Sequence, residues 1–94
     1  MGTKQYIKKN GFVEKHIGDE TVVVPLVGSV AQMEKVFSLN EVGSLIYSNL
    51  SAAKTNDELL TLVLNTFDVS PQTAAADLKH FLQEAVNKGI ITVL

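Results

Sequence analysis

The residue types that carry out chemistry in proteins are sparse in this chain and do not form groups. The histidines, His16 and His80, lie far apart in the sequence, and neither has the local spacing of a metal site or a catalytic triad. Asp57-Glu58 is a pair of carboxylates, but its place in the first turn of an expected helix explains it through capping and the helix dipole. Gly28-Ser29 lacks the glycine-rich surroundings of a phosphate-binding loop. We therefore predict a protein that is not an enzyme and holds no metal and no cofactor.

The composition narrows the function classes further. Cysteine is absent, which excludes disulfides, thiolate nucleophiles, iron-sulfur clusters and the common structural zinc sites. All 8 cationic side chains are lysine, and the net charge is -2. Arginine supplies the planar group that binds phosphates and guanine edges through paired hydrogen bonds, so its absence weakens every nucleic-acid hypothesis. We predict no nucleic-acid partner.

The length and the distribution of apolar residues predict one domain covering residues 1–94. The chain is 46% apolar, which is ample for a single hydrophobic core. No apolar run approaches the roughly 20 residues that a membrane-spanning helix needs, and the N-terminus lacks the apolar block of a signal peptide. These features predict a soluble, cytoplasmic protein without a membrane partner.

The first half of the chain predicts a small antiparallel sheet. Valine and isoleucine are frequent from Phe12 to Leu26, and Gly18-Asp19 interrupts them where a two-residue turn would fit. This pattern predicts a hairpin whose arms are Phe12 to Ile17 and Glu20 to Leu26. Asn10-Gly11 is a competing turn, and it would pair the first arm with residues 6–9 instead. Val36 to Ser38 predicts a short third strand.

The second half predicts three capped helices. Asn40 caps the first, a capping box of Thr55 and Glu58 opens the second, and Ser70-Pro71 begins the third. Gly43 lowers the helix propensity of the first helix, which suggests that another backbone or an aromatic ring packs closely against it. Lys88-Gly89 ends the third helix, and residues 90–93 are extended and could pair with the sheet. Strands followed by helices indicate the α+β class.

An ordered set of short motifs runs through nearly the whole chain. The set comprises Gly11-Phe12-Val13, Ile17-Gly18, Val23-Val24-Pro25, the Leu39-Asn40-x-x-Gly43-x-x-Ile46 helix entrance, Thr55-x-x-Glu58-Leu59, Phe67-Asp68-Val69, Ala76-Asp77 and Phe81-Leu82 before Gly89-Ile90. In this set the chain resembles the PqqD-like proteins, whose domain is the peptide-recognition element of ribosomal natural-product pathways. The chain departs from the family pattern at Tyr47, where the family often has tryptophan, and at Lys15, where arginine is frequent.

The resemblance implies a winged-helix-like fold with three N-terminal antiparallel strands, three helices and a short C-terminal extended segment. It also implies that the leader segment of a precursor peptide is added as a strand along the edge of Val36 to Ser38, with its side chains facing the third helix. Each implied site residue also has an ordinary explanation in the core or on the solvated surface, and Lys35 could simply discourage unwanted edge pairing. The implied peptide-binding residues are Lys35, Val36, Phe37, Ser38, Asp77, His80, Phe81 and Glu84.

Three functions follow from the sequence as alternatives. The first is a non-catalytic chaperone that captures a leader peptide and presents it to a separate modifying enzyme, which in the PqqD-like family is commonly a radical S-adenosylmethionine maturase. The second is a winged-helix DNA-binding regulator, which the absence of arginine disfavours. The third is a structural module that forms a homodimer through an exposed strand.

Overall fold

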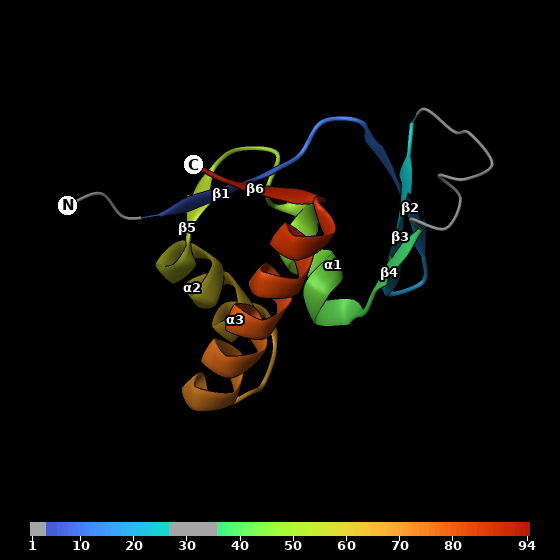
Figure 1. Cartoon of the computed structure of the whole chain (residues 1–94). Coiled ribbons are helices and arrows are strands. Elements are labelled where there is room, and N and C mark those ends of the chain that lie inside the picture. Colours follow the sequence, from blue (N-terminus) through green and yellow to red (C-terminus); the bar gives the residue numbers. More distant parts are fainter. Residues whose placement is uncertain (1–3, 27–35) are drawn as a thin grey trace.

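The computed structural model describes residues 4–26 and 36–94. Its strands form two three-stranded antiparallel sheets, which we call the hairpin sheet (β2-β3-β4) and the terminal sheet (β5-β1-β6). The terminal sheet lies across one end of the group of helices, and the hairpin sheet lies beside the first helix (Figure 1). Lys35 and Gly28-Ser29 lie outside the described residues. In chain order the elements are β1 (Gln5–Lys8), β2 (Phe12–Ile17), β3 (Glu20–Pro25), β4 (Phe37–Leu39), α1 (Glu41–Ser48), β5 (Lys54–Thr55), α2 (Asn56–Thr66), α3 (Pro71–Lys88) and β6 (Ile91–Val93).

The predicted hairpin is confirmed. β2 and β3 pair from Phe12↔Pro25 to Ile17↔Glu20, and Gly18 takes the positive φ of 61° that the two-residue turn requires. The competing arrangement around Asn10-Gly11 does not form, because β1 pairs with β5 and β6 in the other sheet. Asn10-Gly11 instead carries the chain from one sheet to the other (Figure 1).

The predicted third strand is also present, displaced by one residue to Phe37–Leu39. It pairs with β3, with Phe37 opposite Val23 and Ser38 opposite Val22. Because side chains alternate along a strand, Phe37 and Leu39 share the face of the fully buried Val23, whereas Ser38 points the other way and is exposed. The hairpin sheet therefore contributes one face to the core.

All three helix starts follow the predicted caps. Asn40 Oδ1 accepts a hydrogen bond from the Gly43 N–H at 2.9 Å, and Ser70 Oγ accepts one from the Thr73 N–H at 3.2 Å. Thr55 and Glu58 form the complete capping box. The helices then pack their apolar stripes into one core, in which the fully buried side chains include Ile46, Leu59, Leu78 and Ile90.

The expected close approach at Gly43 is confirmed, and the neighbour is an aromatic ring. A Cβ placed on Gly43 would lie 2.9 Å from Cε1 and 3.2 Å from Cδ1 of Phe81 on α3. Real Cβ atoms essentially never approach another atom to less than 3.0 Å, so the first of these contacts could not form without a shift. The glycine therefore sets how closely the start of α1 approaches α3.

The terminal sheet was not predicted as a separate sheet. The extended C-terminal segment is confirmed as β6, but it pairs with β1, and the Leu94 N–H donates to the Gln5 carbonyl at 2.8 Å. Strand β5 is only two residues long, too short for a pattern of alternating residues to reveal it. The α+β class holds, while the winged-helix description fits loosely because the strands divide between two sheets.

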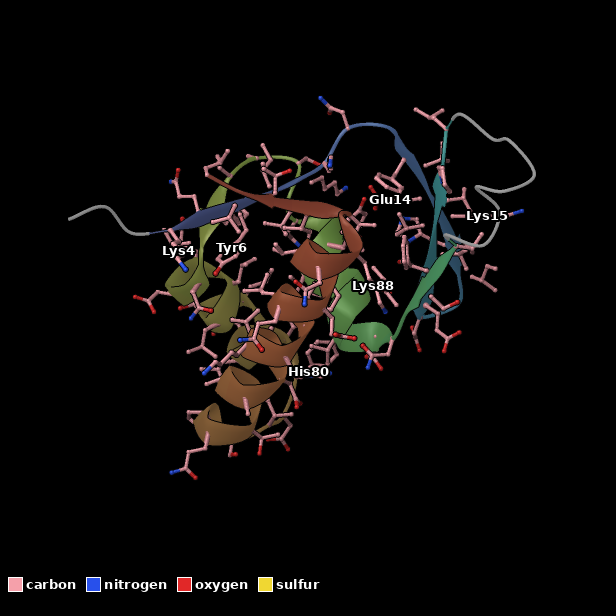
Figure 2. The ribbon with its side chains drawn as sticks, in the orientation of Figure 1. Lys4, Tyr6, Glu14, Lys15, His80 and Lys88 are labelled. Carbon is pink, nitrogen blue, oxygen red and sulfur yellow. The ribbon has the colours of Figure 1, made fainter. Side chains whose placement is uncertain are left out.

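A polar contact joins the hairpin sheet to the rest of the molecule. Lys8 of β1 forms an ion pair with Glu14 of β2, and its ammonium group lies 5.0 Å from the centre of the Tyr47 ring on α1. The neighbouring residue Lys15 points away from the helices, as alternation along β2 requires (Figure 2). Burial, and to a lesser degree the Glu14 charge, raise the pKa of Tyr47 to about 12.

Candidate functional site: a pocket between β4 and α3

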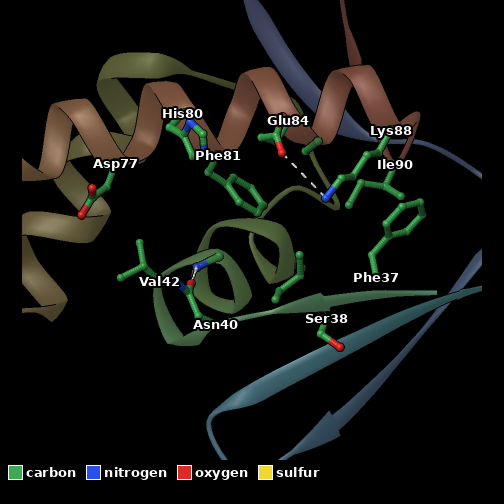
Figure 3. A pocket seen from close by; sticks show the side chains of 13 residues that line it. Phe37, Ser38, Asn40, Val42, Asp77, His80, Phe81, Glu84, Lys88 and Ile90 are labelled. Atoms are coloured by element: carbon green, nitrogen blue, oxygen red, sulfur yellow. Dashed lines mark hydrogen bonds and ion pairs between the residues drawn. The ribbon is translucent and has the colours of Figure 1, made fainter. Parts of the chain in front are cut away.

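A pocket of about 350 Å³ lies between β4, the start of α1 and the C-terminal two-thirds of α3 (Figure 3). Its volume is at the low end of the range for ligand sites in proteins. Such a space suits a few side chains. The lining residues are Phe37, Ser38, Leu39, Asn40, Val42, Gly43, Asp77, His80, Phe81, Glu84, Ala85, Lys88 and Ile90.

Most of the site residues implied by the sequence meet at this pocket. Val36 precedes β4, is 43% exposed and does not line the pocket. Lys35 lies outside the described residues. Phe81 combines the two roles that the sequence left open, because it packs against the core and also forms a wall of the pocket. The implied residues that do line the pocket are Phe37, Ser38, Asp77, His80, Phe81 and Glu84.

Several lining residues are not among those that the sequence implied, and Lys88, Val42 and Ile90 matter most. In the sequence, Lys88 indicates only the end of its helix. It follows Glu84 by one helical turn, so extending the stripe of Asp77, His80, Phe81 and Glu84 by four residues would have included it. Val42 and Ile90 carry no such signal, because they belong to α1 and to the turn after α3. Only the packing of these elements brings them to the pocket.

One wall of the pocket is an open strand edge. β4 pairs with β3 on one side, and within the described ranges 4–26 and 36–94 it pairs with no other strand. An edge strand presents backbone N–H and C=O groups that a further strand can bond. The pocket therefore places backbone hydrogen-bonding groups next to apolar side chains.

The charged groups are distributed unevenly along the pocket. Asp77 lies near one end, beside Val42, and Lys88 lies near the other end, beside Phe37 (Figure 3). The Lys88 ammonium group is 3.8 Å from a carboxylate oxygen of Glu84 and 5.7 Å from the centre of the Phe37 ring. In the part of the chain that the structure describes, Asp77 has no ion-pair partner. The Asp77 end therefore carries an uncompensated negative charge.

A second depression, of about 630 Å³, lies on the other flank of α3. His80 and Glu84 line both depressions, so they occupy the crest of the helix between them. The second depression borders β6 at Val93 and is lined mainly by long polar side chains, among them Lys79, Gln83 and Asn87. One aromatic residue, Tyr6, lines it, whereas two phenylalanines, Phe37 and Phe81, line the first.

Other chemistry is not evident in the described residues. They contain no group of three or more His, Cys, Asp or Glu side chains placed to hold a metal ion. Among residues 4–26 and 36–94, the two side chains with clearly shifted pKa values are Tyr47 and Glu58, and neither lines the pocket beside β4. Hydrogen bonds from Thr55 lower the pKa of Glu58 as part of the capping box. No helix in ranges 4–26 and 36–94 is long and apolar enough to cross a bilayer.

Comparison with known protein families shows which family the chain belongs to. The family described as coenzyme PQQ synthesis protein D (PqqD) matches residues 20–91. The chain belongs to the PqqD family. The match begins at β3 and ends at the start of β6, so it includes every element that forms the pocket.

A solved structure supports the PqqD assignment. The structure titled "TbiB1 in Complex with the TbiA(beta) Leader Peptide" superposes on the chain with a TM-score of 0.73 and 29% sequence identity. The match covers 90% of this chain and 93% of that one. Among curated proteins, no significant match was found.

Proposed function

We propose that this PqqD-family protein is a non-catalytic chaperone that binds the leader segment of a precursor peptide and presents it to a modifying enzyme. The main support for the proposal is that, among the described residues, β4 has an unpaired edge beside a pocket lined by Phe37 and Phe81. Strand addition of this kind uses backbone hydrogen bonds for affinity and side-chain pockets for selectivity. The likeness to TbiB1, whose structure contains a leader peptide, supports the same role.

The two edges of the hairpin sheet differ in a way that favours β4. The edge strand β2 carries Glu14 and Lys15 at its centre, and charged residues at an edge discourage pairing with another chain. Strand β4 consists of Phe37, Ser38 and Leu39 and carries no charge. Of the two edges, β4 is therefore the one open to a guest strand.

The pocket supplies anchors for alternate side chains of the guest. In a strand, every second side chain points to the same face, so those facing α3 would enter the space between Phe37 and Phe81. Ala85 is 2% exposed and lines the pocket, and its small side chain leaves room there. A short strand with two or three such anchors makes an interface near or below about 1,200 Å², for which we expect micromolar to submicromolar binding.

The modifying enzyme is the second proposed partner, and we propose a radical S-adenosylmethionine maturase. The PqqD family name, which refers to the synthesis of a coenzyme, supports a place beside a biosynthetic enzyme. A reconstituted reaction tests this part separately. The maturase should modify its precursor peptide faster when this protein is added. Equal rates with and without it would contradict the presenting role.

Leader binding is tested by titrating the isotope-labelled protein with a synthetic leader segment of the precursor peptide. Strand addition to β4 predicts amide shifts concentrated at residues 36–39 and 77–88. Shifts concentrated at residues 4–6 and 91–94 would instead place the peptide at the second depression and contradict the proposed site. Proline in the middle of the bound segment should weaken binding at least roughly tenfold, because it removes a donor from the ladder.

A matched pair of valine substitutions separates pocket contacts from general effects. Val42 is half-buried at the pocket, whereas Val13 is 43% exposed on β2 outside it. We expect Val42→Gln to weaken leader binding several-fold and Val13→Gln to leave it unchanged. Equal effects of the two substitutions would exclude the pocket as the binding site.

A further inference from the structure

The two ends of the pocket differ in charge. Asp77 stands at the end next to the start of α1, with no ion-pair partner in the described part of the chain. Lys88 stands at the other end, next to Phe37, and is accompanied by Glu84 at 3.8 Å. The Asp77 end of the pocket therefore attracts a cation, whereas at the opposite end the charges of Lys88 and Glu84 offset each other (Figure 3).

The direction of a guest strand follows from how β4 and α3 are placed. Phe37 lies next to Lys88 at the end of α3, and from Phe37 the strand runs toward Asn40, on the side of the pocket where Asp77 lies (Figure 3). β4 and α3 therefore run in opposite directions. Antiparallel pairing is the more stable and more frequent kind. A guest paired antiparallel to β4 runs parallel to α3, so its N-terminal part lies at Asp77.

The spacing of anchor positions follows from helix and strand geometry. The 11 residue steps from Asp77 to Lys88 span about 16 Å along the helix axis at 1.5 Å per residue. Four steps of an extended strand span about 14 Å, and even-numbered steps keep the side chains on one face. If one guest side chain faces Asp77, the side chain two positions later lies near the middle of the pocket, between Phe81 and Ala85.

We propose that the site selects peptides that carry a lysine or arginine two positions before an apolar residue, in the order cation-x-apolar from N- to C-terminus. This inference rests on the proposed function and specifies its ligand. Asp77 attracts the cation, and the part of the pocket beside Phe81 takes the apolar side chain. In the reversed order the cation would lie at the Lys88 end, where the ion pair of Lys88 with Glu84 leaves no net negative charge to attract it. Asp77 is therefore the specificity-determining residue.

The test uses three synthetic peptides of nine residues with blocked ends, built on a threonine background. The first contains Lys-Thr-Leu at its centre, the second Leu-Thr-Lys and the third Glu-Thr-Leu. Dissociation constants come from amide shifts of residues 36–39. Exposed charge pairs are individually weak, so we expect the Lys-Thr-Leu peptide to bind about five-fold more tightly than either of the others, with the preference lost at high salt.

Two protein variants with the same change of charge provide the controls. Asp77→Lys should invert the preference, so that Glu-Thr-Leu binds more tightly than Lys-Thr-Leu. Glu20→Lys alters an exposed residue of β3 that does not line the pocket, and should leave the preference unchanged. Circular dichroism checks that both variants are folded. Both altered residues are exposed, so neither change disturbs the core.

The outcomes separate this inference from the proposed function. Equal affinities for the three peptides, or tighter binding of Leu-Thr-Lys, would overturn the proposed charge order while leaving strand addition to β4 intact. A preference that survives Asp77→Lys would overturn the assignment to Asp77. If neither these peptides nor the leader segment shifts the amides of residues 36–39, the proposed function fails together with the inference.

Discussion

Replacing Gly43 with alanine would add one methyl group between α1 and the Phe81 ring. The new Cβ would lie 2.9 Å from Phe81 Cε1, and comfortable carbon contacts begin at about 3.5 Å, so the ring must withdraw by roughly 0.6 Å or more. Overpacking of this kind costs about 1–3 kcal/mol, while exchanging glycine for alanine in a helix contributes up to about 1 kcal/mol of stability. The ring borders the pocket and can move into it. We therefore expect a net loss of about 1 kcal/mol in the free energy of unfolding.

Urea denaturation and thermal melting measure this loss. In a domain of this size, 1 kcal/mol corresponds to a decrease of about 4–8 °C in Tm. A double-mutant cycle with Phe81→Leu identifies its source. The smaller side chain should relieve the clash, so that Gly43→Ala becomes neutral or stabilising by up to about 1 kcal/mol in that background. The same cost in both backgrounds would refute the reasoning, because the Phe81 contact could not then be its cause.

The same substitution links packing to binding. A ring displaced toward the pocket leaves less room for a guest side chain, so Gly43→Ala should weaken leader binding several-fold even though the protein remains folded. Isothermal titration calorimetry on the folded variant measures this effect. Unchanged affinity would show that the Phe81 ring does not limit the space that a guest side chain uses.

Two further predictions concern stability. Asn40→Ala removes the side-chain acceptor of the Gly43 N–H and should lower the free energy of unfolding by about 1 kcal/mol. Asn40→Asp keeps an acceptor and should cost little. Equal losses for the two variants in urea denaturation would contradict the capping role of Asn40. The pKa of Tyr47 is about 12 in the folded protein and 10 for the ordinary side chain, so the folded state favours the neutral phenol. This preference stabilises the folded state fully below pH 10. Between pH 10 and 12 the stabilisation is lost, because Tyr47 ionises first in the unfolded chain. Denaturation at several pH values should show a steeper decline across this range for the natural protein than for Tyr47→Phe, and parallel declines would contradict the assignment.

The residues beside β4 show how far the sequence alone could locate a site. The family resemblance implied both the third strand and the face of the third helix that carries Asp77, His80, Phe81 and Glu84. Those four residues share a face because a helix repeats its faces every three or four residues. Lys88 was within reach of the same periodicity. Val42 and Ile90 were not, because their place at the pocket depends on how three elements approach one another.

The amino-acid sequence by itself determined the local structure of this protein: the turn at Gly18 and the helix caps. These features depend on hydrogen bonds and steric limits among residues that are near neighbours in the chain, so residue types reveal them. Gly43 indicated that some group packs closely against it, but only the packing of α1 against α3 made that group the Phe81 ring. The tertiary structure alone decided that β1 joins β5 and β6, because such pairing brings together distant segments whose short strands carry little pattern of their own. It also decided that β4 keeps one edge unpaired among the described residues, since an edge is defined by which strands lie beside it.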